Sequence, residues 1–216
     1  MAISATAVDA QQLPKTWEPP FPLGTRDDQE SDGNVDITTA YEAKTDGYMK
    51  VTHFAKVDSA SDNELALRAT LSSYAFGLHH NGPATKIKIQ AVFQLNMSKI
   101  CTKFEDELGV SSLNYDFTQH YQIRAYRKIA GAMVSCGELL HHVNAVHKGR
   151  QPPQGCKEQH SEPESVELTT TSEIDDGQYL EFHVGLKARL YVHVNDYSFD
   201  VSNELFANLM KVTAYV

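Results

Sequence analysis

Residues 180–194 read LEFHVGLKARLYVHV, and this stretch decides the fold class that the sequence predicts. Each even-numbered residue is apolar, whereas the odd-numbered residues are charged, polar or aromatic apart from Gly185. Side chains of a β-strand point alternately to opposite faces, so a period of two predicts a long strand with one buried face. The preceding Asp175-Asp176-Gly177 is typical of a hairpin turn and predicts an antiparallel partner over 166–174.

A second strand with one solvated face is predicted over 86–97, where apolar and polar residues again alternate. A shorter strand is expected over 48–54. The segment 120–136 begins as a strand and then loses its period, which indicates a bulge or a change of structure. Residues 148–164 have the composition of a loop. Together these segments favour an antiparallel sheet.

Two segments carry helix patterns. The sequence SDNE at 61–64 fits a capping box, and leucines and a tyrosine follow at helical spacing up to Leu78. The sequence SNELFANLM at 202–210 repeats this pattern, and shorter helices are expected near 104–108 and 137–147. The sequence therefore predicts an α+β fold in which two or three helices pack on a twisted antiparallel sheet.

Residues 1–46 are expected to form a disordered, flexible arm in front of a single globular domain over 47–216. The arm has little hydrophobic periodicity and a net charge, so apolar burial does not offset the entropy of ordering it. Its segment 13–24, LPKTWEPPFPLG, contains the only tryptophan and half of the eight prolines. Proline removes a backbone donor and fixes φ, which excludes a helix or a central strand here.

This proline-rich segment is a candidate docking peptide, because such chains adopt polyproline II and lose little entropy on binding. Two interpretations remain open. The segment binds a WW-type groove of another protein, or its tryptophan folds back into a hydrophobic hole on its own domain or on a neighbouring subunit. The candidate docking residues are Trp17, Pro19, Pro20, Phe21 and Pro22.

Charge is unevenly distributed along the chain. The net charge of −9 divides into −7 for residues 1–64, +5 for 65–161 and −7 for 162–216. A basic middle region permits a positive face although the average is acidic. Such a face either keeps the protein soluble or attracts anionic lipid or an acidic protein surface. The candidate basic face consists of Lys86, Lys88, Arg124, Arg127, Lys128, Lys187 and Arg189.

The motifs of the common enzyme classes are absent from the sequence. It contains no phosphate-binding glycine loop, no GxSxG, no HExxH and no CxxC, so we expect no enzymatic activity and no cofactor. With no recognisable signal peptide, the three cysteines are expected to be reduced thiols. An alternative zinc site would combine Cys156 and His160 with two of His141, His142 and His147.

The order of these features resembles that of the matrix proteins of rhabdoviruses. The resemblance covers the Pro19-Pro20-Phe21 arm with its acidic run, the short strand at 47–52, the capped helix at 64–78 and the acidic turn and strand at 173–194. It implies a proline-rich late-domain motif in the arm that recruits host budding machinery. It also implies a globular part that self-associates, condenses the nucleocapsid and binds the inner membrane leaflet.

We therefore expect a non-enzymatic viral structural protein that self-assembles, links nucleocapsid to membrane and supports budding. Its expected partners are further copies of itself, the viral nucleocapsid, an anionic membrane surface and host WW-type or budding proteins. Its expected locations are the virion and the host cytoplasm, inner membrane face or nucleus. The alternatives are a small intracellular enzyme or zinc-binding protein that uses the His/Cys cluster, or a viral capsid subunit.

Overall fold

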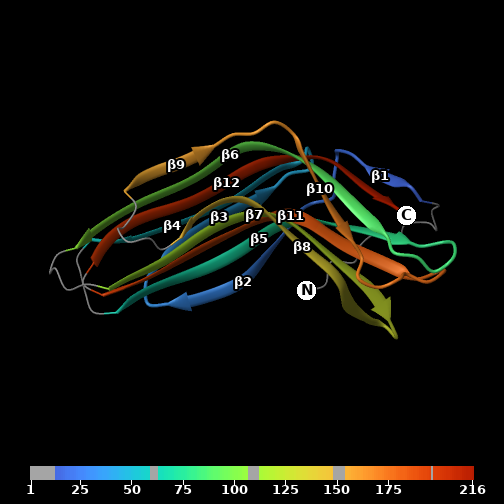
Figure 1. The fold of residues 1–216 in the computed structure, drawn as a ribbon, viewed down its shortest axis with the longest axis horizontal. Coiled ribbons are helices and arrows are strands. Elements are labelled where there is room, and N and C mark those ends of the chain that lie inside the picture. The colour runs from blue at the N-terminus through green and yellow to red at the C-terminus, as the bar shows by residue number, and fades with distance from the viewer. Residues whose placement is uncertain (1–12, 59–62, 107–111, 148–153, 196) are drawn as a thin grey trace.

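The computed structural model describes residues 13–58, 63–106, 112–147, 154–195 and 197–216. These residues form twelve strands and no helix. The strands build two antiparallel sheets that pack against each other in an elongated, arched sandwich (Figure 1). The prediction of an α+β fold with packing helices is therefore wrong, and the protein is all-β over the described residues.

The first sheet has the strand order β10-β6-β12-β4-β3, with β1 beside β12 and β9 beside β6. Long strands β6 and β12 lie at its centre and pair along most of their length. The strands of the first sheet are β1 (Lys15–Trp17), β3 (Ile37–Ala43), β4 (Tyr48–Val57), β6 (Lys88–Asp106), β9 (Gly155–Gln159), β10 (Glu164–Thr169) and β12 (Tyr197–Tyr215).

The second sheet has the strand order β2-β5-β11-β7-β8. Within the two sheets, β10-β6-β12-β4 and β5-β11-β7-β8 have the strand order of an eight-stranded jelly roll, and β3 and β2 extend it at one edge. The strands of the second sheet are β2 (Thr25–Gly33), β5 (Glu64–His79), β7 (Ser112–Ile129), β8 (Ala132–His147) and β11 (Tyr179–Asn195).

The strand predicted from LEFHVGLKARLYVHV is confirmed as β11. Its even-numbered side chains from Leu180 to Val194 are completely buried between the sheets. Its partners are β5 and β7, so the predicted hairpin with 166–174 is wrong. Residues 164–169 form β10 in the first sheet. The chain then crosses to the second sheet after the turn at Gly177, so β10 and β11 do not pair.

The two segments with capped-helix patterns are strands. The predicted helix at 64–78 is β5, in which Tyr74, Phe76 and Leu78 point into the sandwich at strand spacing. The inner face of β5 also carries the polar residues Thr70 and Ser72, so apolar residues do not alternate regularly along the sequence. The segment 202–210 lies within β12 for the same reason, since the inward-pointing residue at its start is Asn203. Ser61, the proposed N-cap, lies outside the described residues.

The arm predicted over 1–46 is folded from residue 13 onward. Its residues form β1, β2 and β3 and belong to both sheets, so the boundary at 46 does not separate an arm from a domain. Trp17 pairs with Val212, and its ring lies 5.6 Å from that of Phe76 and 5.3 Å from that of Phe182. Residues 1–12 lie outside the described part of the chain.

A layer of buried polar side chains separates the apolar core into two clusters. We call this layer the polar belt. Six of its members are completely buried and come from six different strands. They are His53, Thr70, Ser98, Gln119, Asn144 and Asn203.

Hydrogen bonds connect the polar belt across the two sheets. The Gln119 side-chain amide donates to Asn203 Oδ1 at 2.6 Å and to the backbone carbonyl of Glu204 at 2.8 Å. Ser98 Oγ donates to Gln119 Oε1 at 2.5 Å and accepts from Asn144 Nδ2 at 2.8 Å. Because a buried polar group without a partner is costly, these bonds fix how the two sheets align.

Candidate interaction surface

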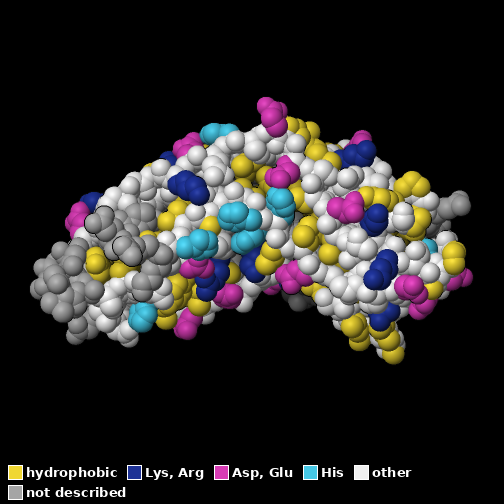
Figure 2. Space-filling model, in the orientation of Figure 1, with side chains coloured by type: hydrophobic (Ala, Val, Ile, Leu, Met, Phe, Trp, Pro, Cys, Tyr) yellow, Lys and Arg dark blue, Asp and Glu magenta, His cyan; other side chains and the backbone are white. Residues whose placement is uncertain are grey.

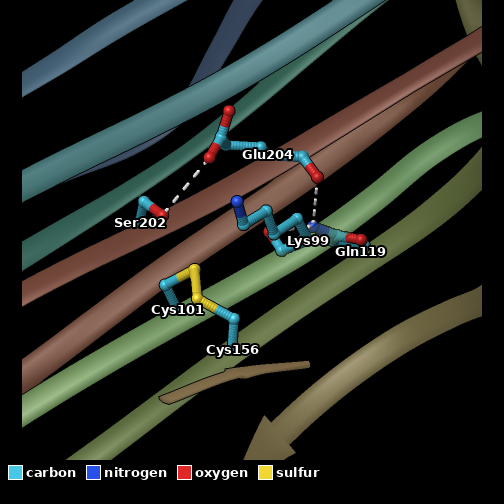
Figure 3. The surroundings of a disulfide bond; sticks show 6 residues. All are labelled: Lys99, Cys101, Gln119, Cys156, Ser202 and Glu204. Carbon is cyan, nitrogen blue, oxygen red and sulfur yellow. Dashed lines mark hydrogen bonds between the residues drawn. A yellow bond between two sulfur atoms is a disulfide. The ribbon is translucent and has the colours of Figure 1, made fainter. Parts of the chain in front are cut away.

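The cysteines do not form the predicted zinc site. Cys101 of β6 and Cys156 of β9 face each other in register and form a disulfide on the outer face of the first sheet (Figure 3). The expectation of three reduced thiols is thus wrong for this pair, and an oxidised Cys156 is no thiolate ligand. Cys136 is a free thiol, and burial raises its pKa. No group of three His, Cys, Asp or Glu is placed to hold a metal within the described residues.

Figure 3 also shows how the disulfide relates to the rest of the sandwich. Lys99, Ser202 and Glu204 lie beside it on the neighbouring strands β6 and β12. The Gln119 side chain reaches this region from the second sheet by its bond to the Glu204 backbone. The disulfide therefore ties the short edge strand β9 to the centre of the molecule.

Two surface hollows of about 200 and 400 Å³ lie on the outer face of the first sheet, and both are lined by Lys103 and Asp200. In the smaller one, Lys56 is paired with Asp58 and Lys103 with Glu105, each at 2.6 Å. These ion pairs join side chains two residues apart and are exposed to solvent. The smaller hollow is also lined by Ser198, and the larger one by the Cys101–Cys156 disulfide.

The predicted basic face does not form one patch. Lys88 is the first residue of β6 in the first sheet, and Lys86 lies just before it. The Lys88 ammonium lies over the Tyr215 ring. The other five cations lie on the second sheet, where acidic residues of β2 and β7 neutralise two of them. Arg124 pairs with Asp27 at 2.9 Å.

Arg189 is the second neutralised cation, and it binds two carboxylates at once. It pairs with Glu30 at 2.9 Å and with Asp116 at 2.7 Å. Lys187 lies half-buried on the same outer face, opposite His120 in the register. The outer face of the second sheet is therefore largely balanced in charge rather than positive.

The β7–β8 hairpin carries an exposed apolar tip. The turn lies at Ala130 and Gly131, both with positive φ. Ile129, Met133 and Val134 are 39%, 42% and 41% exposed. In Figure 2 the hairpin is the projection at the lower right, with hydrophobic side chains at its end.

Two of the predicted cations adjoin this tip. Arg127 and Lys128 directly precede Ile129, and Lys128 is exposed. Arg127 donates to the backbone carbonyl of Glu173 at 3.1 Å, which ties the base of the hairpin to the turn before β11. An apolar end with adjacent cations is an arrangement suited to a membrane interface or a protein partner.

The outermost strand of the second sheet, β8, has a free edge next to the hairpin. The backbone carbonyl of Cys136 accepts a hydrogen bond from Thr171 N at 2.7 Å, and that of Ala145 accepts from Lys157 Nζ at 3.1 Å. Among the described residues, none outside the second sheet forms a backbone hydrogen bond with residues 138–142. The edge is therefore covered at both ends and open in its middle.

Histidines gather along this edge, in the centre of the face shown in Figure 2. The rings of His120 and His142 lie 5.8 Å apart, and His141 pairs with Glu164 of β10 at 2.7 Å. Burial, together with a smaller contribution from the neighbouring His142, lowers the pKa of His120 to about 4. His120 is therefore neutral at physiological pH.

No protein family model matches this chain, and no curated protein matches its sequence. The described residues include no helix long and apolar enough to span a bilayer. The capped helix and the free arm, which carried much of the resemblance to rhabdovirus matrix proteins, are strands of the sandwich from residue 13 onward.

Proposed function

We propose that this protein is a non-enzymatic, matrix-like structural protein that assembles with copies of itself on an anionic membrane. The observation that carries the proposal is the exposed apolar tip of the β7–β8 hairpin beside Arg127 and Lys128. Two residues of the candidate docking peptide contact their own chain, since Phe21 is buried in the core and the partly buried Trp17 packs against it. Pro19, Pro20 and Pro22 are exposed.

The hairpin tip offers a modest membrane affinity. Full burial of a side chain such as Met or Val contributes about 1.5–3 kcal/mol, and each nearby cation contributes about 1 kcal/mol at an anionic surface. Asp175 and Asp176 in the adjacent turn oppose this attraction, so the apolar contacts dominate. Binding of one copy is then weak and reversible, and several linked copies bind far more tightly. Self-assembly and membrane contact support each other in this way.

Vesicle flotation tests the membrane contact. We expect the wild-type chain to float with phosphatidylserine-containing vesicles at low salt and much less with phosphatidylcholine vesicles. The double variant Met133→Asp/Val134→Asp should stay at the bottom of the gradient. Phe54→Asp is the matched control, because Phe54 is 43% exposed on the outer face of the first sheet. A wild-type chain that does not float, or a double variant that floats equally well, contradicts the proposal.

The strand order favours a second candidate, a subunit of a closed protein shell. Jelly rolls with the order seen here recur in viral capsid proteins, although a fold by itself does not define a function. This candidate shares self-assembly with the first but needs no membrane. Electron microscopy of the assembled protein separates them, since closed shells in the absence of lipid favour the second and layers on vesicles favour the first.

A further inference from the structure

The open middle of the β8 edge fits a second copy of itself. We propose that two molecules pair their β8 strands in antiparallel fashion about a twofold axis at Leu140, which joins the two second sheets into one continuous sheet. This inference rests on the self-assembly in the proposed function and names the surface that performs it.

The sequence of β8 lacks the residues that usually protect an edge strand, and its two irregularities lie outside the segment 137–142. Natural edges are blocked by lysine, proline or strong bulges, because unpaired backbone groups attract another strand. The sixteen residues of β8 include no lysine, arginine or proline. Its pairing with β7 is irregular at two places, and between them the register is regular from Gly137 to His142. This regular segment is the part of the edge left open.

Side chains on the open segment are complementary to themselves. Glu138, Leu140 and His142 alternate along β8 and lie on the outer face of the second sheet, since their β7 partners lie there. Leu140 is 44% exposed, and His142 is also exposed. An antiparallel pairing centred on Leu140 places it against Leu140 of the partner subunit. The same register places Glu138 against His142 of the partner subunit, and the twofold axis repeats that pair.

This register satisfies both the backbone and the side chains. Directly opposite residues in an antiparallel pair have Cβ atoms about 4.5–5.5 Å apart, close enough for the two leucines to pack and for each histidine to meet a carboxylate. A pairing of this length buries less area than a standard interface, so we expect it to be weak and concentration-dependent. A layer of many copies on a surface compensates for a weak single contact.

Site-directed crosslinking tests the register. In Leu140→Cys the two introduced thiols face each other, within the Cα separation of about 4.4–6.8 Å that a disulfide needs. Oxidation of this variant should therefore give covalent dimers. Glu138→Cys is the matched control, because residue 138 faces residue 142 of the other copy and not itself. Equal crosslinking of the two variants, or none in Leu140→Cys under conditions where the wild type assembles, overturns the proposed register.

A charge exchange tests the side-chain pairing. His142→Glu places a carboxylate opposite Glu138 twice in each dimer and should weaken self-association by about tenfold. The double variant Glu138→Lys/His142→Glu restores opposite charges and should recover the wild-type association. Thermal unfolding of each variant confirms that the chain is folded. Failure of the double variant to recover, with its fold intact, contradicts the pairing.

The two proposals fail in different ways. A wild-type chain that stays monomeric at all concentrations, with and without anionic vesicles, removes the self-assembly in the proposed function and the β8 pairing with it. A wild-type chain that assembles while Leu140→Asp assembles equally well removes only the β8 pairing. Leu23→Asp controls for the added charge, because Leu23 is 79% exposed and lies in the segment before β2.

Discussion

The role of Trp17 predicted from the sequence differs from the packing seen in the structure. A tryptophan among prolines indicated a peptide made to bind another molecule. In the structure its indole packs against both Phe76 and Phe182, and the Lys15 ammonium lies 4.8 Å from its centroid. The sequence predicts that this residue is buried by something, but only the fold determines what buries it. The open alternative in which the tryptophan folds back onto its own domain is the arrangement observed.

The packing of Trp17 predicts a stability effect. Trp17→Ala removes the packing of a partly buried ring against Phe76 and Phe182 and should lower the free energy of unfolding by about 2 kcal/mol, measured by chemical denaturation. Leu23→Ala should leave it nearly unchanged, because Leu23 is 79% exposed. An effect of Trp17→Ala on association alone, with stability unchanged, would contradict this role.

His53 predicts the response of stability to acid. Its Nε2 donates to Thr70 Oγ1 at 3.0 Å, since the Thr70 hydroxyl itself donates to Asp28. The pKa of His53 is lowered to about 3, mainly by burial and in part by the nearby Arg68, while Asp28 opposes the shift. The unfolded chain takes up this proton near pH 6.5 and the folded chain does not. Stability from this residue is therefore complete above pH 6.5 and is lost as the pH falls toward 3.

A variant isolates the contribution of His53. Each proton bound only by the unfolded state lowers the free energy of unfolding by about 1.4 kcal/mol per pH unit. His53→Gln keeps a donor for Thr70 and does not titrate, so its stability should fall less steeply between pH 6 and 4, by one proton. Denaturation curves at several pH values measure both slopes. Equal slopes in the two proteins would show that His53 does not stay neutral in the fold.

At the scale of strands, the sequence predicts some elements and misleads on others. β11 is recognisable because every inward-pointing residue along it is apolar. β5 and β12 are not, because Thr70, Ser72 and Asn203 occupy inward positions and leave leucines at spacings that also fit a helix. The polar residues that align the sheets therefore interrupt the alternation of apolar and polar residues by which β5 and β12 would be recognised in the sequence. Local spacing cannot reveal polar groups that are satisfied only by partners on the other sheet.

The disulfide between β6 and β9 gives a prediction at the same scale. It joins residues 55 apart in sequence, and a crosslink of that span stabilises a fold by about 4 kcal/mol in the chain-entropy model. Cys101→Ser/Cys156→Ser should lower the free energy of unfolding by up to that amount. Hydrogen exchange should increase first in β9, which has only β6 as a neighbour. Protection of β9 equal to that of β12 in this variant would contradict the idea that the disulfide retains the strand.

The hairpin and edge of β8 were only partly predictable. The sequence identifies Arg127 and Lys128 as basic residues, and the loss of period beside them indicates an irregularity. The apolar tip was not predicted, and its only local signal is the isolated Gly131 within a strand pattern, which indicates an irregularity but not a hairpin turn. Leu140 gave no signal, since a free strand edge follows from strand order and not from local sequence.

At the scale of the whole molecule, the fold explains why self-assembly fits this surface. Two packed sheets leave four edges, and a sheet edge is the part of a β-protein that another copy of the chain extends most easily. On the outer face of the second sheet, Arg124 and Arg189 pair with carboxylates, so this face adds no local patch of like charge beside the junction. In the proposed function, the adjacent hairpin is the part of each joined pair that contacts the membrane.

Sedimentation velocity of the full chain over a wide concentration range tests self-assembly most directly. The account predicts monomers at low concentration, dimers and larger species as concentration rises, and a shift to lower concentrations when anionic vesicles are present. It also predicts that Leu140→Asp stays monomeric over the range in which Leu23→Asp assembles like the wild type. A wild-type chain that sediments as a single monomeric species at every concentration, with and without vesicles, would contradict it.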